Sequence, residues 1–231
     1  MGLGLWYNMD MKASPKLSKT SKMPAKSWSL PAWETCPGAR DDDGKPVNAC
    51  EGCYALTGAY QFPGTIASRE HNLADWKASD WVSVMVASMK RAKLFRWFDS
   101  GDAYSVELIR KIHEVVKLTP HVKHWLPTRS YKVPKLWQAL QAIDAEPNCV
   151  VRCSSDSIDG ERLSGYNNDS VILRSAEDFT PEKGYSLCRA YTRGGKCGDC
   201  RACWSKAVRT VAYPKHGKRV NPKQFEKALQ V

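Results

Sequence analysis

Apolar residues recur along this chain with two periods, one typical of strands and one typical of helices. From Leu94 onward, short apolar runs alternate with longer stretches in which apolar residues return every three or four positions. The predicted strands are the runs at 94–98, 121–126, 149–153, 171–175 and 208–213, preceded upstream by SWSLPAW at 27–33. Strands that alternate with helices indicate βαβ units, and therefore an α/β fold with a parallel sheet.

The helices predicted between these strands limit the kind of sheet that can form. Residues 65–93 form one long or two short helices in this interpretation, residues 105–118 form one helix, and a further helix begins at Pro134. About six strands fit a partial (βα)6-type barrel better than a full eight-stranded one, and a doubly wound open sheet is the alternative. We therefore predict a partial barrel followed by a cysteine-rich C-terminal segment.

Length and the absence of a linker favour a single unit. With 231 residues and no low-complexity segment, the chain is expected to form one domain over residues 1–231, with basic and mobile ends. No apolar run is long enough to span a bilayer, and the start of the chain lacks the apolar region of a secretory signal. We therefore predict a protein of the reducing cytosol without membrane contact.

The charge balance changes this picture by suggesting a partner. The formal net charge is +11, and lysines gather near both ends of the chain. Such a charge favours polyanionic partners, nucleic acid foremost, because binding releases counterions. The alternative is that these lysines only solvate the two ends, since charge alone carries no specificity.

Seven of the nine cysteines fall into two groups. We call Cys36, Cys50 and Cys53 the N-terminal cysteine group, and Cys188, Cys197, Cys200 and Cys203 the C-terminal cysteine group. In a reducing compartment structural disulfides are disfavoured, so gathered cysteines indicate metal ligands or redox groups.

The spacing in the C-terminal group favours iron–sulfur over zinc. Cys197, Cys200 and Cys203 follow the pattern C-x2-C-x2-C, which bacterial ferredoxins use for a [4Fe-4S] cluster, and Cys188 supplies a fourth thiolate. Zinc sites more often join two separate C-x2-C pairs, and zinc with four thiolates would be closed and structural. Zinc therefore stays the alternative metal.

The N-terminal group has three cysteines in the pattern C-x13-C-x2-C. Three thiolates can hold a [4Fe-4S] cluster while leaving one iron free for a ligand or substrate. This reasoning predicts chemistry at the N-terminal group and an auxiliary cluster at the C-terminal group. An arrangement in which all these cysteines serve one cluster also stays open, and so does a non-catalytic nucleic-acid-binding protein with structural metal.

Polar residues follow several predicted strands. Asp102, Arg129 and Asp156 are spaced at intervals of 27 residues (129 − 102 and 156 − 129), which fits one βα unit. In a (β/α) barrel the ends of the strands build the active site. The predicted catalytic residues are Asp99, Ser100, Asp102 and Arg129, and a guanidinium such as that of Arg129, together with Lys132, suits an anion.

Other candidate residues receive structural interpretations. Cys149 and Cys153 bracket one strand, so their Cα atoms lie about 13 Å apart and cannot jointly bind one ion. Cys149 is expected to be a small buried side chain, whereas Cys153 could line the site. The histidines are expected to be structural: His113, His121 and His124. The tyrosines at 54, 104 and 131 follow cysteine or strand-end motifs and could flank a ligand.

Three cysteines after the first strand and a following βα partial barrel resemble the radical S-adenosylmethionine (SAM) superfamily. The resemblance implies that the free iron binds SAM, which makes an electron donor a partner. Ser100, Gly101 and Asp102 take the place of the family's GGE-like motif at the SAM amino group. Arg152 and Ser154 are likewise placed near the SAM ribose and carboxylate. The family's usual spacing is C-x3-C-x2-C, and the first gap here is longer.

Over nearly its whole length the chain also resembles a bacteriophage family of gene-product-eighty-eight-like proteins. The residues that carry this resemblance are SWSLPAWETCPG, CEGCYA, FRWFDSGDAYS and CGDCRACW. The resemblance implies a phage origin, hence the cytosol of a host cell, and an iron–sulfur or metal-binding protein. It implies no particular reaction.

Overall fold

A computed structural model describes residues 12–215 and 220–228 of the protein, and its centre is an eight-stranded sheet. The strands are β1 (Leu17–Lys19), β2 (Lys26–Trp28), β3 (Leu94–Trp97), β4 (Lys123–Thr128), β5 (Cys149–Ser154), β6 (Asp169–Leu173), β7 (Ser186–Leu187) and β8 (Thr210–Pro214). Their order is β1-β2-β3-β4-β5-β6-β8-β7. Only the pairing of β1 with β2 is antiparallel, so β2 to β8 all end at one edge of the sheet.

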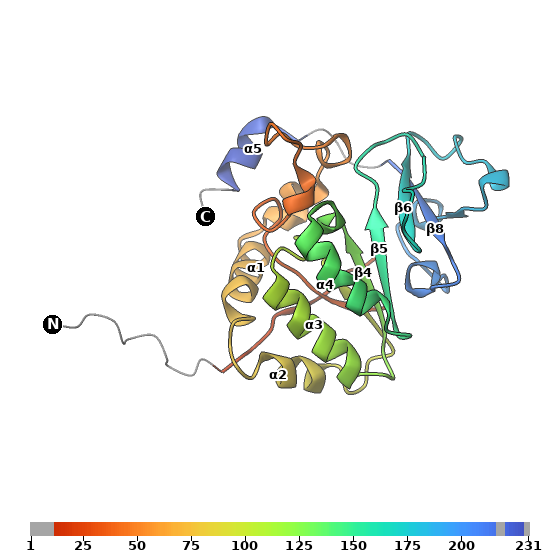
Figure 1. The fold of residues 1–231 in the computed structure, drawn as a ribbon. Coiled ribbons are helices and arrows are strands. Elements are labelled where there is room, and N and C mark those ends of the chain that lie inside the picture. The colour runs from red at the N-terminus through yellow and green to blue at the C-terminus, as the bar shows by residue number, and fades with distance from the viewer. Residues whose placement is uncertain (1–11, 216–219, 229–231) are drawn as a thin grey trace.

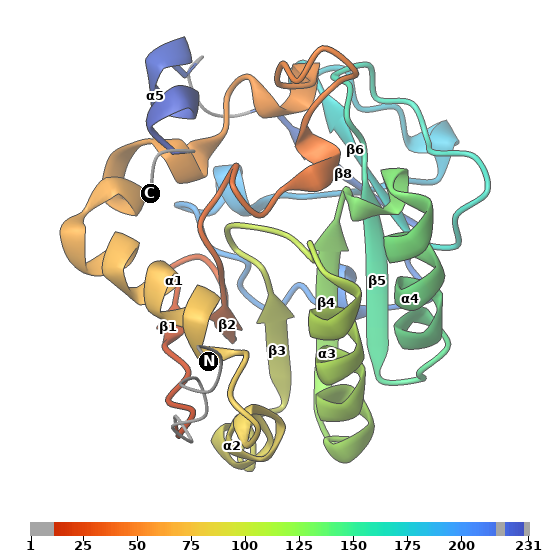
Figure 2. The same cartoon turned by 60° about the vertical axis from the view of Figure 1, so that its left-hand side comes forward.

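Four helices lie on one face of this sheet. They are α1 (Pro63–Asp75), α2 (Trp81–Ser88), α3 (Val106–Leu118) and α4 (Pro134–Asp144), and a short helix α5 (Pro222–Lys227) lies near the loop that follows β2 (Figures 1 and 2). Proline occupies the first turn of α1, α4 and α5, where its missing N–H costs no hydrogen bond. The Ser105 side chain caps α3 by accepting from the Leu108 N–H.

Strand alternation separates two layers of packing. Phe95 and Trp97 of β3 point into the main core, where Trp28 and Trp81 contact each other edge to face at 5.3 Å. Arg96, between them in sequence, belongs to the opposite face of β3. This alternation leaves one sheet face for the helices and one for other chain segments.

The segment that carries Cys197, Cys200 and Cys203 covers part of the sheet face opposite the helices. Trp204 donates from Nε1 to the carbonyl oxygen of Phe95 at 2.8 Å, and its ring contacts Trp125 of β4 edge to face at 5.2 Å. Met23 packs in the same apolar cluster, together with the partly buried Cys197 and Cys203. The cysteines of this segment are therefore anchored against the sheet itself.

The predicted mixed α/β class with a mostly parallel sheet is confirmed. The structure adds the short edge strands β1 and β7 and the helix α5, which sequence periodicity did not predict, and residues 63–88 form two helices. The strand order is linear, with β1 and β7 at its two edges. The predicted mobile ends lie largely outside the described residues, at 1–11 and 229–231. In the part of the chain that is described, no helix is long and apolar enough to cross a bilayer.

His124 of β4 provides a pH-dependent test of the core. Its ring is buried and stacks on Trp97, and Nε2 lies 2.9 Å from Thr119 Oγ1. Burial, with a smaller effect of His121, lowers its pKa from 6.5 to about 3. As the pH falls, the His124 ring therefore takes up a proton at a higher pH in the unfolded chain than in the folded one. The contribution of neutral His124 to stability is complete above pH 6.5 and is lost as the pH falls towards 3. In an NMR titration the His124 ring is expected to stay neutral at pH 5; a midpoint near 6.5 would contradict this.

Candidate functional site

The N-terminal cysteine group lies in the long loop that follows β2, at the edge where the parallel strands end. Cys50 is buried, and Cys36 and Cys53 are half-buried. All three belong to or pack against one apolar cluster that also contains Trp33 and, from α5, Phe225. Three soft sulfur donors are thus gathered in an apolar environment.

Burial raises the pKa of all three thiols, and neighbouring thiols add to the effect for Cys36 and Cys53. After burial, Asp102 and Cys53 contribute most to the raised pKa of Cys36. Cys50 adds to the raised pKa of Cys53, which reaches about 11. For Cys50 the largest charge effect is that of Arg129, which opposes burial and lowers the pKa. Thiols of this kind stay protonated until a cation displaces the proton.

Close backbone contacts hold the loop that carries the N-terminal cysteine group against the ends of β4 and β5. The N–H of Ala49, next to Cys50, donates to the carbonyl oxygen of Asp156 at 2.9 Å. A Cβ atom added at Gly38 would lie 2.0 Å from the carbonyl oxygen of Arg129, so only glycine allows this approach. The cysteine loop and the strand ends therefore form one unit.

The structure brings the strand-end charges Asp102, Arg129 and Asp156 to this same edge. Arg129 donates from its backbone N–H to Asp102 Oδ2 at 2.7 Å and from Nε to the carbonyl oxygen of Ser155 at 2.9 Å. Lys132 Nζ lies 2.9 Å from Asp156 Oδ2. Burial raises the pKa of Asp102, opposed by hydrogen bonds that it accepts. The charges of all four groups act on the pKa of Cys50, two lowering it and two raising it.

Asp99 and Ser100 connect the end of β3 to the segment after β2. Ser100 Oγ donates to the carbonyl oxygen of Leu30 at 2.6 Å, and the Leu30 N–H donates back to the carbonyl oxygen of Ser100 at 3.0 Å. The Asp99 carboxylate accepts from the Ser29 hydroxyl and, at 3.5 Å, from Tyr60 OH. Ser100 thus links β3 to the segment after β2, and Asp99 is a buried carboxylate held by hydroxyl groups.

Gly101 lies where the end of β3 packs closely against the segment after β2, and it provides a test of stability. Its φ is +74°, and an added Cβ would lie 2.6 Å from both Leu30 Cβ and Thr35 Oγ1. Gly44 has a similar φ of +76° but nothing within 4 Å of an added Cβ, which makes it a matched control. We expect Gly101→Ala to lose about 2–4 kcal/mol of unfolding free energy and Gly44→Ala about 1 kcal/mol, measured by chemical denaturation. Equal losses would show that the close packing has no effect.

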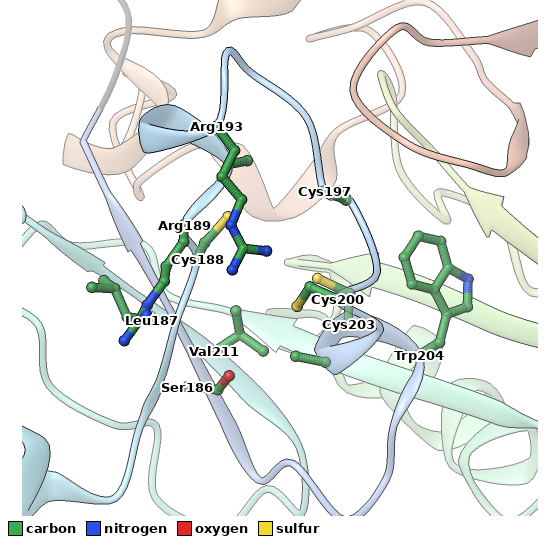
Figure 3. Close-up of a pocket in the computed structure, with 12 residues that line it drawn as sticks. Ser186, Leu187, Cys188, Arg189, Arg193, Cys197, Cys200, Cys203, Trp204 and Val211 are labelled. Atoms are coloured by element: carbon green, nitrogen blue, oxygen red, sulfur yellow. The ribbon is translucent and has the colours of Figure 1, made fainter.

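The four cysteines of the C-terminal group line one cavity of about 230 Å³. Cys188 directly follows β7 and donates its N–H to the carbonyl oxygen of Ala212 at 2.8 Å, while the Cys197 N–H donates to the carbonyl oxygen of Lys22 at 2.9 Å. Figure 3 shows the cysteines around the cavity, with Arg189 and Arg193 on one side and Trp204 on the other. The three cysteines of the C-x2-C-x2-C pattern thus lie around a shared space together with the distant Cys188.

Basic groups surround these thiols. Burial raises the pKa of Cys203 to about 11, opposed by a 3.1 Å contact with Tyr213 OH and by the charges of Arg152 and Arg96. Burial also raises the pKa of Cys197, which Lys22 and Arg201 lower. Arg189 and Arg193 line the cavity and are exposed. This positive field would offset the negative charge of several thiolates.

Arg152 holds the segment that carries Cys203. It is fully buried, and both of its terminal nitrogens donate to backbone carbonyls at 2.8–3.3 Å. The acceptors are the carbonyl oxygens of Asp169, Ala202, Ser205, Val208 and Arg209. Through these hydrogen bonds Arg152 fixes the segment that carries Cys203 against β5 and β6. Ser154 is half-buried, and its carbonyl oxygen accepts from Tyr131 OH at 3.1 Å.

Cys149 and Cys153 are both buried in β5 and belong to neither group. Burial raises the pKa of each. Tyr104 accepts a hydrogen bond from Trp76 Nε1 at 3.0 Å. By contrast, Tyr54 donates to the carbonyl oxygen of Asp99 at 2.8 Å, next to the N-terminal group.

Sequence reasoning missed Arg96 and Tyr213. Arg96 lies 3.4 Å from Tyr54 OH and stacks over the ring of Trp125 at 4.6 Å. Its signal was a lone arginine within the apolar run LFRWF, which indicates a charged side chain on the face away from the main core. Tyr213 gave no such signal, because only the folded chain brings it to Cys203.

Fold and geometry together define a mixed α/β protein with two separate cysteine groups. The N-terminal group lies at the strand ends, and the C-terminal group lies on the sheet face opposite the helices. Within residues 12–215 and 220–228, no set of three or more His, Cys, Asp or Glu side chains is arranged to hold a single metal ion.

A family model described as Gene product 88 matches residues 7–206, and the chain therefore belongs to the Gene product 88 family of bacteriophage proteins. The matched span includes all seven cysteines of the two groups. No curated protein and no solved structure matches the chain. The comparisons support the predicted phage family and add no support for the resemblance to radical SAM proteins.

Proposed function

We propose that this protein binds iron–sulfur clusters and acts as a redox enzyme. The C-terminal cysteine group would hold a [4Fe-4S] cluster through Cys188, Cys197, Cys200 and Cys203. The observation that carries the proposal is the cavity of about 230 Å³ that all four of these cysteines line. This volume lies below the range of about 300–1,000 Å³ typical of organic ligands, and it exceeds what a single ion needs.

The donor set fits such a cluster. Three of the four cysteines have the spacing used by ferredoxins, and all four line a cavity with Arg189 and Arg193 on its rim and with the charges of Arg96 and Arg152 nearby. Thiolates around a cubane bind different irons, so they enclose a space instead of converging on one point. The chain's contribution is to orient the sulfurs, through Arg152 and the Lys22 carbonyl, and to supply positive charge.

The N-terminal group would hold a second cluster through three thiolates. Cys36, Cys50 and Cys53 offer three donors, and Arg129 and Lys132 lie beside Cys50 where an anionic ligand of an open iron could be bound. A cluster with an open iron supplies one-electron chemistry and a coordination position for a substrate or for SAM. Curvature of the sheet into a partial, radical-SAM-like barrel would place this loop at its mouth.

Anaerobic purification followed by iron and sulfide analysis tests the proposal. We expect a brown protein with about four irons and four sulfides for each cluster. A colourless protein that carries stoichiometric zinc would contradict it. If iron is present, a change in the electron paramagnetic resonance spectrum of the reduced protein on addition of SAM would support an open iron that binds SAM, and an unchanged spectrum would remove SAM as its ligand.

A second candidate is a nucleic-acid-binding protein with structural zinc or iron–sulfur sites. The observation that favours it is the exposed basic rim of the C-terminal group: Arg189, Arg193, Lys196 and Arg201. Binding to phosphates by such a rim weakens steeply as salt concentration rises. Salt-independent binding of a nucleic acid, or no binding at low salt, would exclude this candidate.

A further inference from the structure

Two arginines on strands flanking β4 face the side of the sheet that carries the C-terminal group, and their terminal nitrogens are satisfied very differently. Those of Arg152 donate to backbone carbonyl oxygens at 2.8–3.3 Å. Among the described residues, the partners of the Arg96 terminal nitrogens are the Met23 thioether at 3.6 Å and Tyr54 OH at 3.4 Å. Within the same part of the chain the Nε atoms of both arginines are buried without a partner, so the difference lies in the terminal nitrogens.

The partners of Arg96 are poor acceptors for a guanidinium. A thioether accepts hydrogen bonds weakly, and a phenol offers no charge, whereas the guanidinium has five N–H donors. Among the described residues no carboxylate lies within ion-pair distance of Arg96, and its charged end stacks over Trp125. A half-buried cation with unused donors is stabilised by binding an oxyanion.

The surroundings of Arg96 carry one surplus positive charge. Asp99 is the carboxylate whose negative charge raises the pKa of both Arg96 and Arg69. The Arg69 Nη1 atom lies near carbonyl oxygens at 3.4–3.5 Å, and its guanidinium sits over the ring of Tyr60. Burial raises the pKa of Tyr60, so this phenol stays neutral. Arg96, Arg69 and Asp99 together carry a net charge of one positive unit, which a ligand with a single negative charge would neutralise.

This place is open to solvent. Tyr54 is 40% exposed, and its hydrogen bond with Arg96 lies at the surface. The rings of Tyr54 and Tyr60 are 5.2 Å apart and offer an apolar contact beside the charge. Tyr54 directly follows Cys53 in sequence, and the charge of Arg96 lowers the pKa of Cys203.

We propose that the Arg96 guanidinium binds the carboxylate group of a small monoanionic ligand, with the Tyr54 ring as an apolar contact beside it. The planar guanidinium fork matches a carboxylate in two parallel hydrogen bonds. The surplus of one charge favours a carboxylate over a phosphate, which carries more charge near neutral pH. This site lies between the two cysteine groups and does not depend on what metal either of them holds.

The test is thermal unfolding of the anaerobically purified protein in acetate, phosphate or chloride at equal ionic strength. Acetate is expected to raise the midpoint saturably above its value in chloride, because a ligand that binds the folded state stabilises it. Arg96→Lys should weaken the acetate effect by roughly tenfold or more, since the fork is lost although the charge stays. Arg96→Met should abolish it. Arg110→Lys, at an exposed arginine of α3 outside both cysteine groups, is the matched control and should behave as the wild type does.

Each other outcome overturns the proposal. An equal response to acetate and chloride in the wild type removes the site, and this arm needs no variant to fold. A stronger saturable effect of phosphate replaces the carboxylate assignment by a phosphate site. An undiminished acetate effect in Arg96→Met places binding elsewhere. Iron content measured on the same samples reports separately on the cysteine groups, so the two proposals fail independently.

Discussion

The double variant Cys197→Ala/Cys200→Ala is expected to remove about four irons from each chain while the iron of the N-terminal group stays. Both cysteines line the shared cavity, so their loss leaves two donors, fewer than the three thiolates that hold a [4Fe-4S] cluster. Because metal binding is coupled to folding, the remaining segment should also unfold at lower temperature than in the wild type. The measurement is iron and sulfide analysis after anaerobic purification, with thermal unfolding of the same sample.

Cys149→Ala is the matched control for this change. Cys149 is a buried free cysteine of β5 and belongs to neither cysteine group. Cys149→Ala should keep its full iron content and lose only packing in the core. Equal iron contents in Cys197→Ala/Cys200→Ala and Cys149→Ala would show that the C-terminal group does not hold iron.

Arg152→Met is expected to cost about 3–5 kcal/mol of unfolding free energy. The substitution leaves buried carbonyl oxygens of the 202–209 segment and of Asp169 without their donors, and unsatisfied buried groups are expensive. Methionine keeps much of the volume, so the loss reports hydrogen bonding more than packing. The loss is measured by chemical denaturation, and hydrogen exchange should show faster opening at residues 202–209.

Arg110→Met supplies the control, because Arg110 of α3 is exposed and its loss should change stability by less than about 0.5 kcal/mol. If Arg152→Met were as stable as Arg110→Met, the segment that carries Cys203 would be held by other contacts.

Periodicity predicted the elements that have many local signals. The apolar stripe of α3 and the runs that became β3, β4 and β5 are long enough to show their period, and Pro134 marks the start of α4. The edge strands β1 and β7 have three and two residues, too few to show alternation. The helix α5 did carry a signal, since Asn221 and Gln224 form a capping box around Pro222.

The cysteine spacing predicted a donor set but not its surroundings. That Cys188 joins Cys197 around one cavity depends on β7 pairing beside β8, a contact that no local pattern encodes. Arg152 illustrates the opposite case, because analogy placed it at a cofactor while tertiary contacts engage its terminal nitrogens with backbone carbonyls. Charged residues on strands have roles that depend on which loops cross them.

An anomalous diffraction map at the iron edge, from crystals grown without oxygen, addresses the central claim most directly. The account predicts a compact four-iron peak enclosed by Cys188, Cys197, Cys200 and Cys203. Free thiols, paired sulfurs or a single peak at the zinc edge in that cavity would contradict it.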